Sequence, residues 1–157
     1  RMYPAAHRRF MQLPINDRLA VFSDILSFLE CVASRNYVAI DFYDGSIMYD
    51  FANGKTTICD IDLFHKQPCV NDMGRMWGSS RFQSPEEYQL GADIDEITNV
   101  YTLGATAFAL FGEYNRTREK WQLSDKLFEI ATRAVSDDRT KRQQSIRQFT
   151  AEWEAAQ

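Results

Sequence analysis

Cysteine and histidine are too scarce in this sequence to build a disulfide framework or a zinc site. The cysteines Cys31, Cys59 and Cys69 are odd in number and include no C-x-x-C pair. His7 and His65 are too few to complete a metal cluster with them. Because thiols stay reduced in the cytosol and disulfides form in oxidising compartments, we expect a cytoplasmic protein.

Long apolar runs and an excess of basic residues are missing as well. A membrane helix needs ~20 apolar residues, and the longest candidate, residues 100–111, is interrupted by Thr102, Gly104 and Thr106. The net charge of -4 differs from the positive charge typical of nucleic-acid-binding domains. We therefore expect neither a membrane nor a nucleic acid as partner, and we interpret residues 100–111 as a buried core helix.

The length and the apolar content suffice for one domain. The chain has 157 residues, of which 45% are apolar, and this is enough for a hydrophobic core. It opens with Arg-Met-Tyr-Pro, without an initiator methionine and without the apolar segment of a signal peptide. We therefore predict that residues 1–157 form a single domain of a longer polypeptide.

Helical periodicity marks the N-terminal part of the chain. Residues 1–13 predict a loop with a short helix. A longer helix then begins near Asn16, a favoured N-cap residue that follows Pro14. Its apolar residues recur at three- and four-residue spacing and form one face, which comprises Leu19, Phe22, Ile25, Leu26, Leu29 and Val32.

Short runs of β-branched and aromatic residues follow this helix. They comprise residues 37–40, 46–51 and 56–60. Asp44-Gly45 and Asn53-Gly54 separate them, and both dipeptides favour turns because their residues tolerate positive φ. We predict a small β-hairpin from about Ile47 to Cys59, with its tip at or near Asn53-Gly54.

A loop and a long apolar helix occupy the next part of the sequence. Residues 65–82 follow neither the helical nor the strand period. Ser84-Pro85 predicts a short helix, because proline is favoured at the first helical position. Asp93 with Glu96 has the spacing of a capping box that would open the long helix, and Gly112 would end it.

Two further helices are predicted at the C-terminal end. One covers residues 123–135, with Ser124 as its cap, and the other covers residues 143–153. The first would turn one apolar face inward, composed of Leu127, Ile130, Ala131, Ala134 and Val135.

The order of these elements resembles the C-terminal, helical lobe of protein kinases. Residues 78–86 are G-S-S-R-F-Q-S-P-E, where the family has G-T-x-x-[YF]-x-[AS]-P-E. Residues 99–104 are N-V-Y-T-L-G, where the family has D-V-[YW]-S-[LF]-G. The resemblance covers nearly the whole chain. It implies a mainly α fold with a small β-hairpin at the catalytic and metal loops.

The resemblance implies two acidic site residues. Ala39-Ile40-Asp41 stands where the family has H-R-D, so Asp41 would be the catalytic aspartate that orients the attacking hydroxyl. Asp60-Ile61-Asp62 stands where the family has D-F-G, so Asp60 would hold Mg²⁺ against the phosphates of ATP. Without the resemblance, both aspartates are ordinary residues that cap turns.

Three positions depart from the family pattern near the phosphates. Ser46 replaces the asparagine that helps to hold a second Mg²⁺, and it would be a weaker metal and cofactor ligand. Tyr43 replaces a lysine that contacts the transferred phosphoryl group, which removes a stabilising cation. Asp62 replaces a glycine and adds a negative charge. The missing His and Arg of H-R-D also make activation by a phosphorylated loop unexpected.

The remaining family positions have substrate-loop and structural roles. Ser79 and Ser84 would lie in the substrate-binding loop. Glu86 would pair with an arginine late in the lobe, for which Arg142 is the first choice and Arg139 the second. Asn99 replaces an aspartate that anchors the backbone of the catalytic loop, so it keeps an acceptor oxygen but loses the charge.

The family's smaller N-terminal lobe has no counterpart in this sequence. No G-x-G-x-x-G occurs, and the residues before Asn16 are too few to form that lobe. We expect ATP and Mg²⁺ to bind only the full-length protein, and this chain alone to be inactive. The expected partners are the missing lobe, a protein substrate or protein partner, and a second copy on the face that the lobe would cover.

Four functions stay open. The parent protein would be a divergent, compact, bacterial Ser/Thr protein kinase-like phosphotransferase, or a pseudokinase that serves as an interaction module. A phosphotransferase of the aminoglycoside or choline kinase type is a third option, which the Ser-Pro-Glu segment opposes. A helical domain without an active site explains the periodicities but not the ordered matches.

Overall fold

The protein is mainly helical, as predicted, and the computed structural model describes residues 4–157. The α-helices of this range are α1 (Pro4–Met11), α2 (Ile15–Ser34), α3 (Glu96–Phe111), α4 (Asp125–Ala134) and α5 (Ile146–Glu154). The 3-10 helices are η1 (Asp44–Ser46), η2 (Pro85–Tyr88), η3 (Arg118–Lys120) and η4 (Arg139–Lys141). The strands are β1 (Tyr37–Val38), β2 (Ile47–Asp50), β3 (Lys55–Ile58), β4 (His65–Lys66), β5 (Cys69–Val70) and β6 (Asp93–Ile94). None of the helices in residues 4–157 has the length and apolar character needed to cross a membrane.

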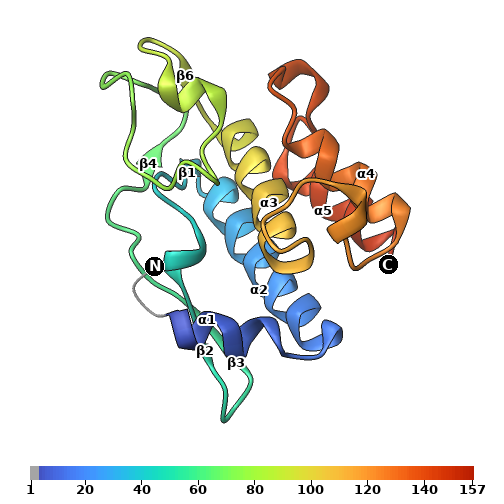
Figure 1. Ribbon diagram of the computed structural model, residues 1–157. Helices are drawn as coiled ribbons and strands as arrows, with labels where there is room; N and C mark the ends of the chain where they lie inside the picture. The colour runs from blue at the N-terminus through green and yellow to red at the C-terminus, as the bar shows by residue number, and fades with distance from the viewer. Residues whose placement is uncertain (1–3) are drawn as a thin grey trace.

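Helix α3 is the centre of the fold. Every residue from Thr98 to Phe111 is buried, because α2 packs along one side of the helix and α4 and α5 pack along the other (Figure 1). This explains why its sequence is apolar around the whole circumference. The prediction of a buried core helix over residues 100–111 is confirmed.

Aromatic side chains fill the space between α2, α3 and α5. The rings of Phe22 and Trp153 lie 4.7 Å apart between centroids, and those of Phe111 and Trp153 lie 6.1 Å apart. All three side chains are fully buried. Aromatic side chains of this size each bury ~150–250 Å², so this cluster makes a large contribution to the hydrophobic stabilisation.

Helix α2 follows the predicted periodicity, but it begins differently. Pro14 is the N-cap residue, and its carbonyl accepts hydrogen bonds from the backbone N–H groups of Asp17 and Arg18. Asn16 lies inside the first turn, so the prediction that it caps the helix is wrong. On the predicted face, Phe22, Ile25, Leu26 and Leu29 are buried, whereas Leu19 and Val32 are partly buried.

The predicted hairpin is present. Strands β2 and β3 are antiparallel, with Ile47 opposite Ile58 and Asp50 opposite Lys55. Gly54 has a φ of 64°, which the turn requires, and the Asp50 carboxylate accepts hydrogen bonds from Asn53 and from the Ala52 N–H. Strands β1 and β4, and likewise β5 and β6, form two further antiparallel pairs of two residues each.

The long helix is capped two residues later than the sequence predicted. Asp93 lies in β6, opposite Val70 of β5. Asp95 is the N-cap residue of α3, and its carboxylate accepts a hydrogen bond from the Ile97 N–H. Glu96 instead accepts a hydrogen bond from the Ile146 N–H at the start of α5.

The other helix ends agree more closely with the sequence. Gly112 is the C-cap of α3, and Ser124 caps α4 by accepting a hydrogen bond from the Leu127 N–H. Helix α5 is shorter than predicted, because Ser145 caps it and it begins at Ile146. The short helix predicted inside residues 1–13 is α1, while residues 1–3 lie outside the described part of the chain.

Candidate functional site

The loop that carries Asp41 is fastened to the central helix. The Asn99 carboxamide of α3 makes two hydrogen bonds to Ala39: Oδ1 accepts from the backbone N–H at 2.7 Å, and Nδ2 donates to the carbonyl at 2.7 Å. Asn99 is 1% exposed. This arrangement fixes the backbone two residues before Asp41, and it is the anchoring contact expected of Asn99.

Asp41 and Asp60 both have left-handed backbone conformations. Their φ angles are 61° and 62°. Such angles are uncommon for residues other than glycine, although aspartate tolerates them better than most. Backbone strain of this kind gathers at functional sites and in turns, so it makes these residues candidates for a function without assigning one.

Ser46 joins the two aspartate loops. Its hydroxyl donates to the Asp41 carbonyl at 3.4 Å and lies 3.5 Å from the Tyr43 N–H. Its own carbonyl accepts a hydrogen bond from the N–H of Cys59, the residue before Asp60, at 2.9 Å. Ser46 is fully buried. Its hydroxyl would have to leave these backbone partners to ligate a metal ion, so the predicted ligand role stays a prediction.

The aspartates interact electrostatically. Burial raises the pKa of Asp41, and the charge of Asp60 raises it further. Burial likewise raises the pKa of Tyr43, and the charges of Asp41, Asp60 and Asp44 act in the same direction. The charges of Asp41 and Asp60 therefore act on the same neighbourhood, which includes Tyr43.

Two carboxylates are fewer ligands than a protein metal site usually needs. Among residues 4–157 no group of three or more His, Cys, Asp or Glu side chains could hold a metal ion. Mg²⁺ commonly binds one or two carboxylates and takes the rest of its ligands from water and substrate phosphates. The Mg²⁺ role predicted for Asp60 would therefore need further ligands from water and substrate phosphates, and it stays a prediction.

Residues 78–86 form a compact turn beside this loop. Gly78 has a φ of 142°, and a Cβ at this position would lie 3.0 Å from the Gln83 amide nitrogen, so glycine is needed there. The Ser79 carbonyl accepts hydrogen bonds from Phe82 and Gln83, but within the described residues no hydrogen bond joins Ser79 to Asp41. Ser84 caps η2, with Pro85 at its start as predicted.

Arg81 of this turn and Tyr114 contact Asp44, in the loop that carries Asp41. The Tyr114 hydroxyl donates to the Asp44 carboxylate at 2.5 Å, and the Arg81 guanidinium lies 3.6 Å from the same carboxylate. The guanidinium carbon of Arg81 is also 4.6 Å from the centroid of the Tyr114 ring. Apart from the turn signal at Asp44-Gly45, nothing in the sequence predicts these contacts, because they join segments that lie far apart in the chain.

The buried ion pair expected at Glu86 is present. Two nitrogens of Arg142 donate to the two Glu86 oxygens at 2.7 and 2.9 Å, and Arg139 adds a contact of 3.2 Å. Burial acts to raise the pKa of Glu86, but the hydrogen bonds and charges of the arginines outweigh it and hold that pKa below its usual value. Both arginines proposed as partners therefore contact Glu86.

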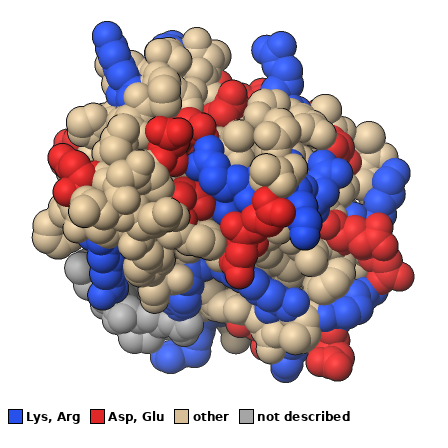
Figure 2. Space-filling view, turned by 90° about the horizontal axis from the view of Figure 1, so that it is seen from above, with Lys and Arg blue, Asp and Glu red and all other residues tan. Residues whose placement is uncertain are grey.

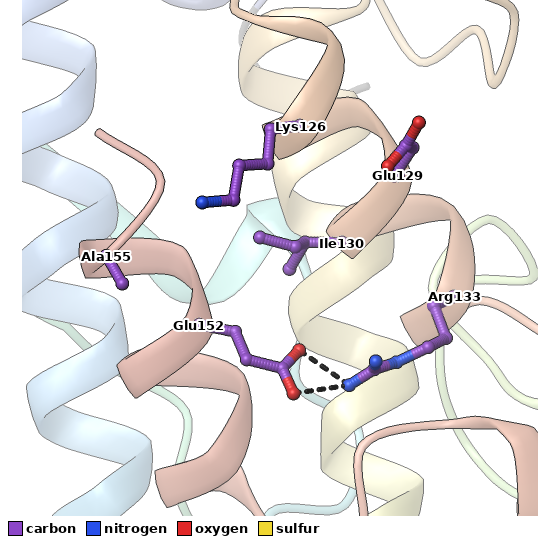
Figure 3. Close-up of a pocket in the computed structure, with 6 residues that line it drawn as sticks. All are labelled: Lys126, Glu129, Ile130, Arg133, Glu152 and Ala155. Carbon is purple, nitrogen blue, oxygen red and sulfur yellow. Dashed lines mark hydrogen bonds and ion pairs between the residues drawn. The ribbon is translucent and has the colours of Figure 1, made fainter.

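Two hollows lie elsewhere on the surface. The first, of about 440 Å³, lies between α4 and α5, where Arg133 donates to both Glu152 oxygens at 2.6 and 2.5 Å (Figure 3). The second, of about 810 Å³, lies between the C-terminal end of α2 and the start of α5. Neither is lined by Asp41 or Asp60. On the face seen in Figure 2, basic and acidic side chains alternate without forming one continuous basic patch.

Comparison with known proteins adds no family to this picture. Neither a scan against models of protein families nor a search of curated proteins found a match. The function of this chain must therefore be inferred from its residues and their geometry.

Proposed function

We propose that this chain is the helical half of a protein kinase-like phosphotransferase, in which Asp41 orients the attacking hydroxyl and Asp60 holds Mg²⁺. Three features support the proposal: the clamp of Asn99 on Ala39, the two left-handed aspartates joined through Ser46, and the buried pair of Glu86 with Arg142. The pattern of residues that suggests the family thus coincides with contacts that would hold such a site together.

The connection of the Asp41 and Asp60 loops through Ser46 carries most weight. A phosphoryl transfer needs one carboxylate near the hydroxyl and one that holds Mg²⁺ on the phosphates, both in the same cleft. Ser46 hydrogen-bonds to the Asp41 carbonyl and to the N–H of Cys59, the residue before Asp60, so the two loops are held next to each other, and the charge of Asp60 raises the pKa of Asp41. The family's glycine-rich loop and strand lysine, which form the other half of such a cleft, have no counterpart in residues 1–157.

Metal binding can be tested on this chain alone. Mn²⁺, a paramagnetic substitute for Mg²⁺, is expected to broaden the amide resonances around Asp41 and Asp60, with weak affinity because the ligands are few. Asp60→Asn should abolish the broadening, whereas Asp137→Asn, a change of an exposed aspartate, should leave it intact. Broadening that survives Asp60→Asn would exclude Asp60 as the metal ligand.

Phosphoryl transfer can be tested in the natural polypeptide that contains these residues. Asp41→Asn and Asp60→Asn should each lower the rate of transfer from labelled ATP. For Asp41→Asn we expect a loss of about 10²–10⁴-fold, because a positioned base contributes a factor of this size. This chain by itself should neither transfer phosphate nor bind ATP at micromolar affinity. Turnover that is unchanged by both substitutions would remove the kinase assignment of these residues.

The second candidate is a pseudokinase that acts as an interaction module. The Ser46 hydroxyl is occupied by backbone groups, and Tyr43 takes the place of a phosphate-binding lysine. Large apolar side chains are exposed on the loops after Asp60, including Ile61, Trp77 and Leu90, which are 53%, 61% and 69% exposed. Exposed apolar surface is typical of binding sites. Retained Mn²⁺ binding without phosphoryl transfer by the natural polypeptide would favour this candidate.

A further inference from the structure

Two segments after the Asp60 loop lie side by side and form one unit. This unit, which we call the double loop, comprises residues 69–77 and 84–94. Strand β5 of the first segment pairs with β6 of the second, at the upper left of Figure 1. The Gly91 N–H donates to the Asn71 carbonyl at 2.7 Å, and the Met76 N–H donates to the Glu87 carbonyl at 2.9 Å. The backbone of the double loop is therefore fixed by hydrogen bonds between its two segments.

The inner side of the double loop packs on the core. Met76 and Ile94 are buried in one cluster with Val38 and Ile40, and Cys69 packs against this cluster. Successive side chains of a strand point to opposite faces. The residue that follows Cys69 in β5 is accordingly exposed, so the double loop has an inner and an outer side.

The outer side of the double loop exposes large apolar side chains. They are between 43% and 69% exposed and comprise Val70, Met73, Trp77, Tyr88 and Leu90. The Gln83 side chain holds two of these residues together, because its amide donates to the Trp77 carbonyl and accepts from the Tyr88 hydroxyl. Tryptophan, tyrosine and methionine are enriched in protein interfaces, so the composition of this surface is that of an interface core.

Two charges of opposite sign flank the apolar side chains. Asp72 and Arg75 stand on either side of Met73 and are both exposed. Among residues 4–157 neither of them forms an ion pair. The Arg75 guanidinium carbon lies 6.0 Å from the centroid of the Tyr88 ring, so this cation stands beside the apolar surface. An acid and a base are thus available to a partner at the same place.

A two-fold axis makes such a surface complementary to itself. In a symmetric dimer, a residue of one copy meets a second residue of the other copy, and the reverse contact occurs as well. Asp72 and Arg75 can therefore form two identical ion pairs, one on each side of the axis, with the apolar side chains between them. A different protein would need an acid and a base in matching positions, whereas a second copy carries both already.

We propose that the outer side of the double loop is the docking surface for a second copy of this chain. Trp77 is its apolar anchor, and Asp72 of each copy pairs with Arg75 of the other. The inference does not depend on phosphotransferase activity, because it rests on exposed side chains, hydrogen bonds and charges that the proposed reaction does not use.

Sedimentation velocity of this chain between about 1 and 300 µM tests the association. We expect a monomer–dimer equilibrium with a Kd of about 10–100 µM, as is typical of a small interface. Trp77→Ser should weaken it at least about 10-fold, because a buried aromatic anchor carries much of the binding energy. Met48→Ser, the control, changes a similarly exposed residue of the β2–β3 hairpin and should leave the Kd unchanged. A monomer at all these concentrations would overturn the proposal and leave the surface to a different protein.

Charge reversals test the symmetry of the dimer. Asp72→Arg and Arg75→Asp should each weaken self-association at least about 10-fold, because like charges then meet on both sides of the axis. An equimolar mixture of the two variants should associate like the unsubstituted chain, since each reversed charge meets an opposite one. Each reversal changes the net charge of -4 by two units, so both variants stay negative and general attraction does not explain their association. A mixture that remains monomeric would overturn the two-fold arrangement.

Tryptophan fluorescence locates the interface. Trp77 is 61% exposed, whereas Trp121 and Trp153 are 5% and 1% exposed, so acrylamide, a neutral quencher, acts mainly on Trp77. Its quenching should weaken over the concentrations at which the dimer forms. A dimer whose Trp77 is quenched as strongly as that of the monomer would have its interface elsewhere, which would overturn the proposal.

Discussion

The buried side chains around Glu86 illustrate how strongly single residues are fixed in this protein. Arg142 is fully buried and donates to both oxygens of Glu86, which is itself 5% exposed. Arg139 contacts the same carboxylate from a more exposed position and also pairs with Asp95. The two arginines are therefore not equivalent, although both contact Glu86.

Replacing Arg142 by methionine should destabilise the protein far more than replacing Arg139 by glutamine. The first change leaves Glu86 buried without its main partner, at a cost of ~3–5 kcal/mol. The second removes a more exposed contact and should cost about 1 kcal/mol. Urea unfolding of both variants measures the difference, with Arg147→Gln, an exposed surface change, as the control. Equal losses would mean that the Glu86–Arg142 pair is not the dominant contact.

Asn99 allows a second comparison at the residue scale. The carboxamide both accepts from and donates to Ala39, whereas a carboxylate can only accept. Asn99→Asp introduces the residue of the kinase pattern, yet we expect it to lower the free energy of unfolding by about 1–3 kcal/mol, because the Ala39 carbonyl loses its donor and a charge is buried. Urea unfolding at pH 7 tests this. A stability equal to that of the unsubstituted protein would show that the loop adapts to the aspartate.

Helices α3 and α4 pack closely at a single glycine. A Cβ at position 104 would lie 2.7 Å from the Ala134 Cβ and 2.9 Å from both the Ala131 carbonyl oxygen and a Val135 methyl group. These distances are shorter than ordinary contacts, and one of the neighbours is backbone. The glycine thus sets the spacing of the two helices.

Gly104→Ala should therefore destabilise the protein, although alanine favours helix by ~1 kcal/mol over glycine. Overpacking usually costs ~1–3 kcal/mol, and the backbone oxygen leaves little room to relax, so we expect a net loss of about 1–2 kcal/mol. Thermal and urea unfolding provide the measurement. A gain in stability would show that α4 moves away at no cost.

At the scale of the whole molecule, the buried carboxylates of Glu86 and Glu87 and the partly buried one of Glu152 predict how stability depends on pH. The raised pKa of Glu87, about 7, gives stability that is complete below its unfolded value of 4.5 and is lost as pH rises through 7. The lowered pKa values of Glu86 and Glu152 act in the opposite sense, since their contributions exist above the unfolded value and disappear as the pH falls.

We therefore expect the free energy of unfolding to be largest near pH 5. The free energy of unfolding should fall below pH 5. It should also fall by up to about 2–3 kcal/mol between pH 5 and pH 8, because Glu87 loses its proton more readily in the unfolded than in the folded protein. Urea unfolding across this range measures the curve, and Glu87→Gln should flatten its alkaline side. A maximum at pH 8 would contradict a folded protein in which burial keeps Glu87 protonated at mildly acidic pH.

Much of the fold follows from patterns that act over a few residues. The apolar face of α2, the Asn53-Gly54 turn and the Ser124 cap are confirmed, because each depends on neighbours within one or two turns of the chain. The cap of α3 was missed because Glu96 follows Asp93 at capping-box spacing, whereas the residue three positions after Asp95 is Thr98, which the capping-box motif does not include. The pairing of β6 with β5, across more than twenty residues of sequence, places Asp93 in a strand.

The candidate site likewise contains residues that short motifs predicted and contacts that the sequence did not predict. The sequence, through its resemblance, selected Asp41 and Asp60 and proposed Arg142 as the partner of Glu86, since these residues are part of short motifs. Whether the aspartates act on phosphate stays a prediction. Asp44, Arg81 and Tyr114 were not predicted, because contacts between distant segments leave no local pattern.

By itself, then, the sequence determined that the chain is mainly helical, where most helices and the hairpin lie, and which acidic residues are candidates. Tertiary structure alone decided that Ser46 is buried between two loops, that Gly104 sets a helix contact, and that Glu87 is enclosed without a cation of its own. The physical reason is that periodicity and turn preference are properties of neighbouring residues. Burial and charge balance depend on which distant side chains come together when the chain folds.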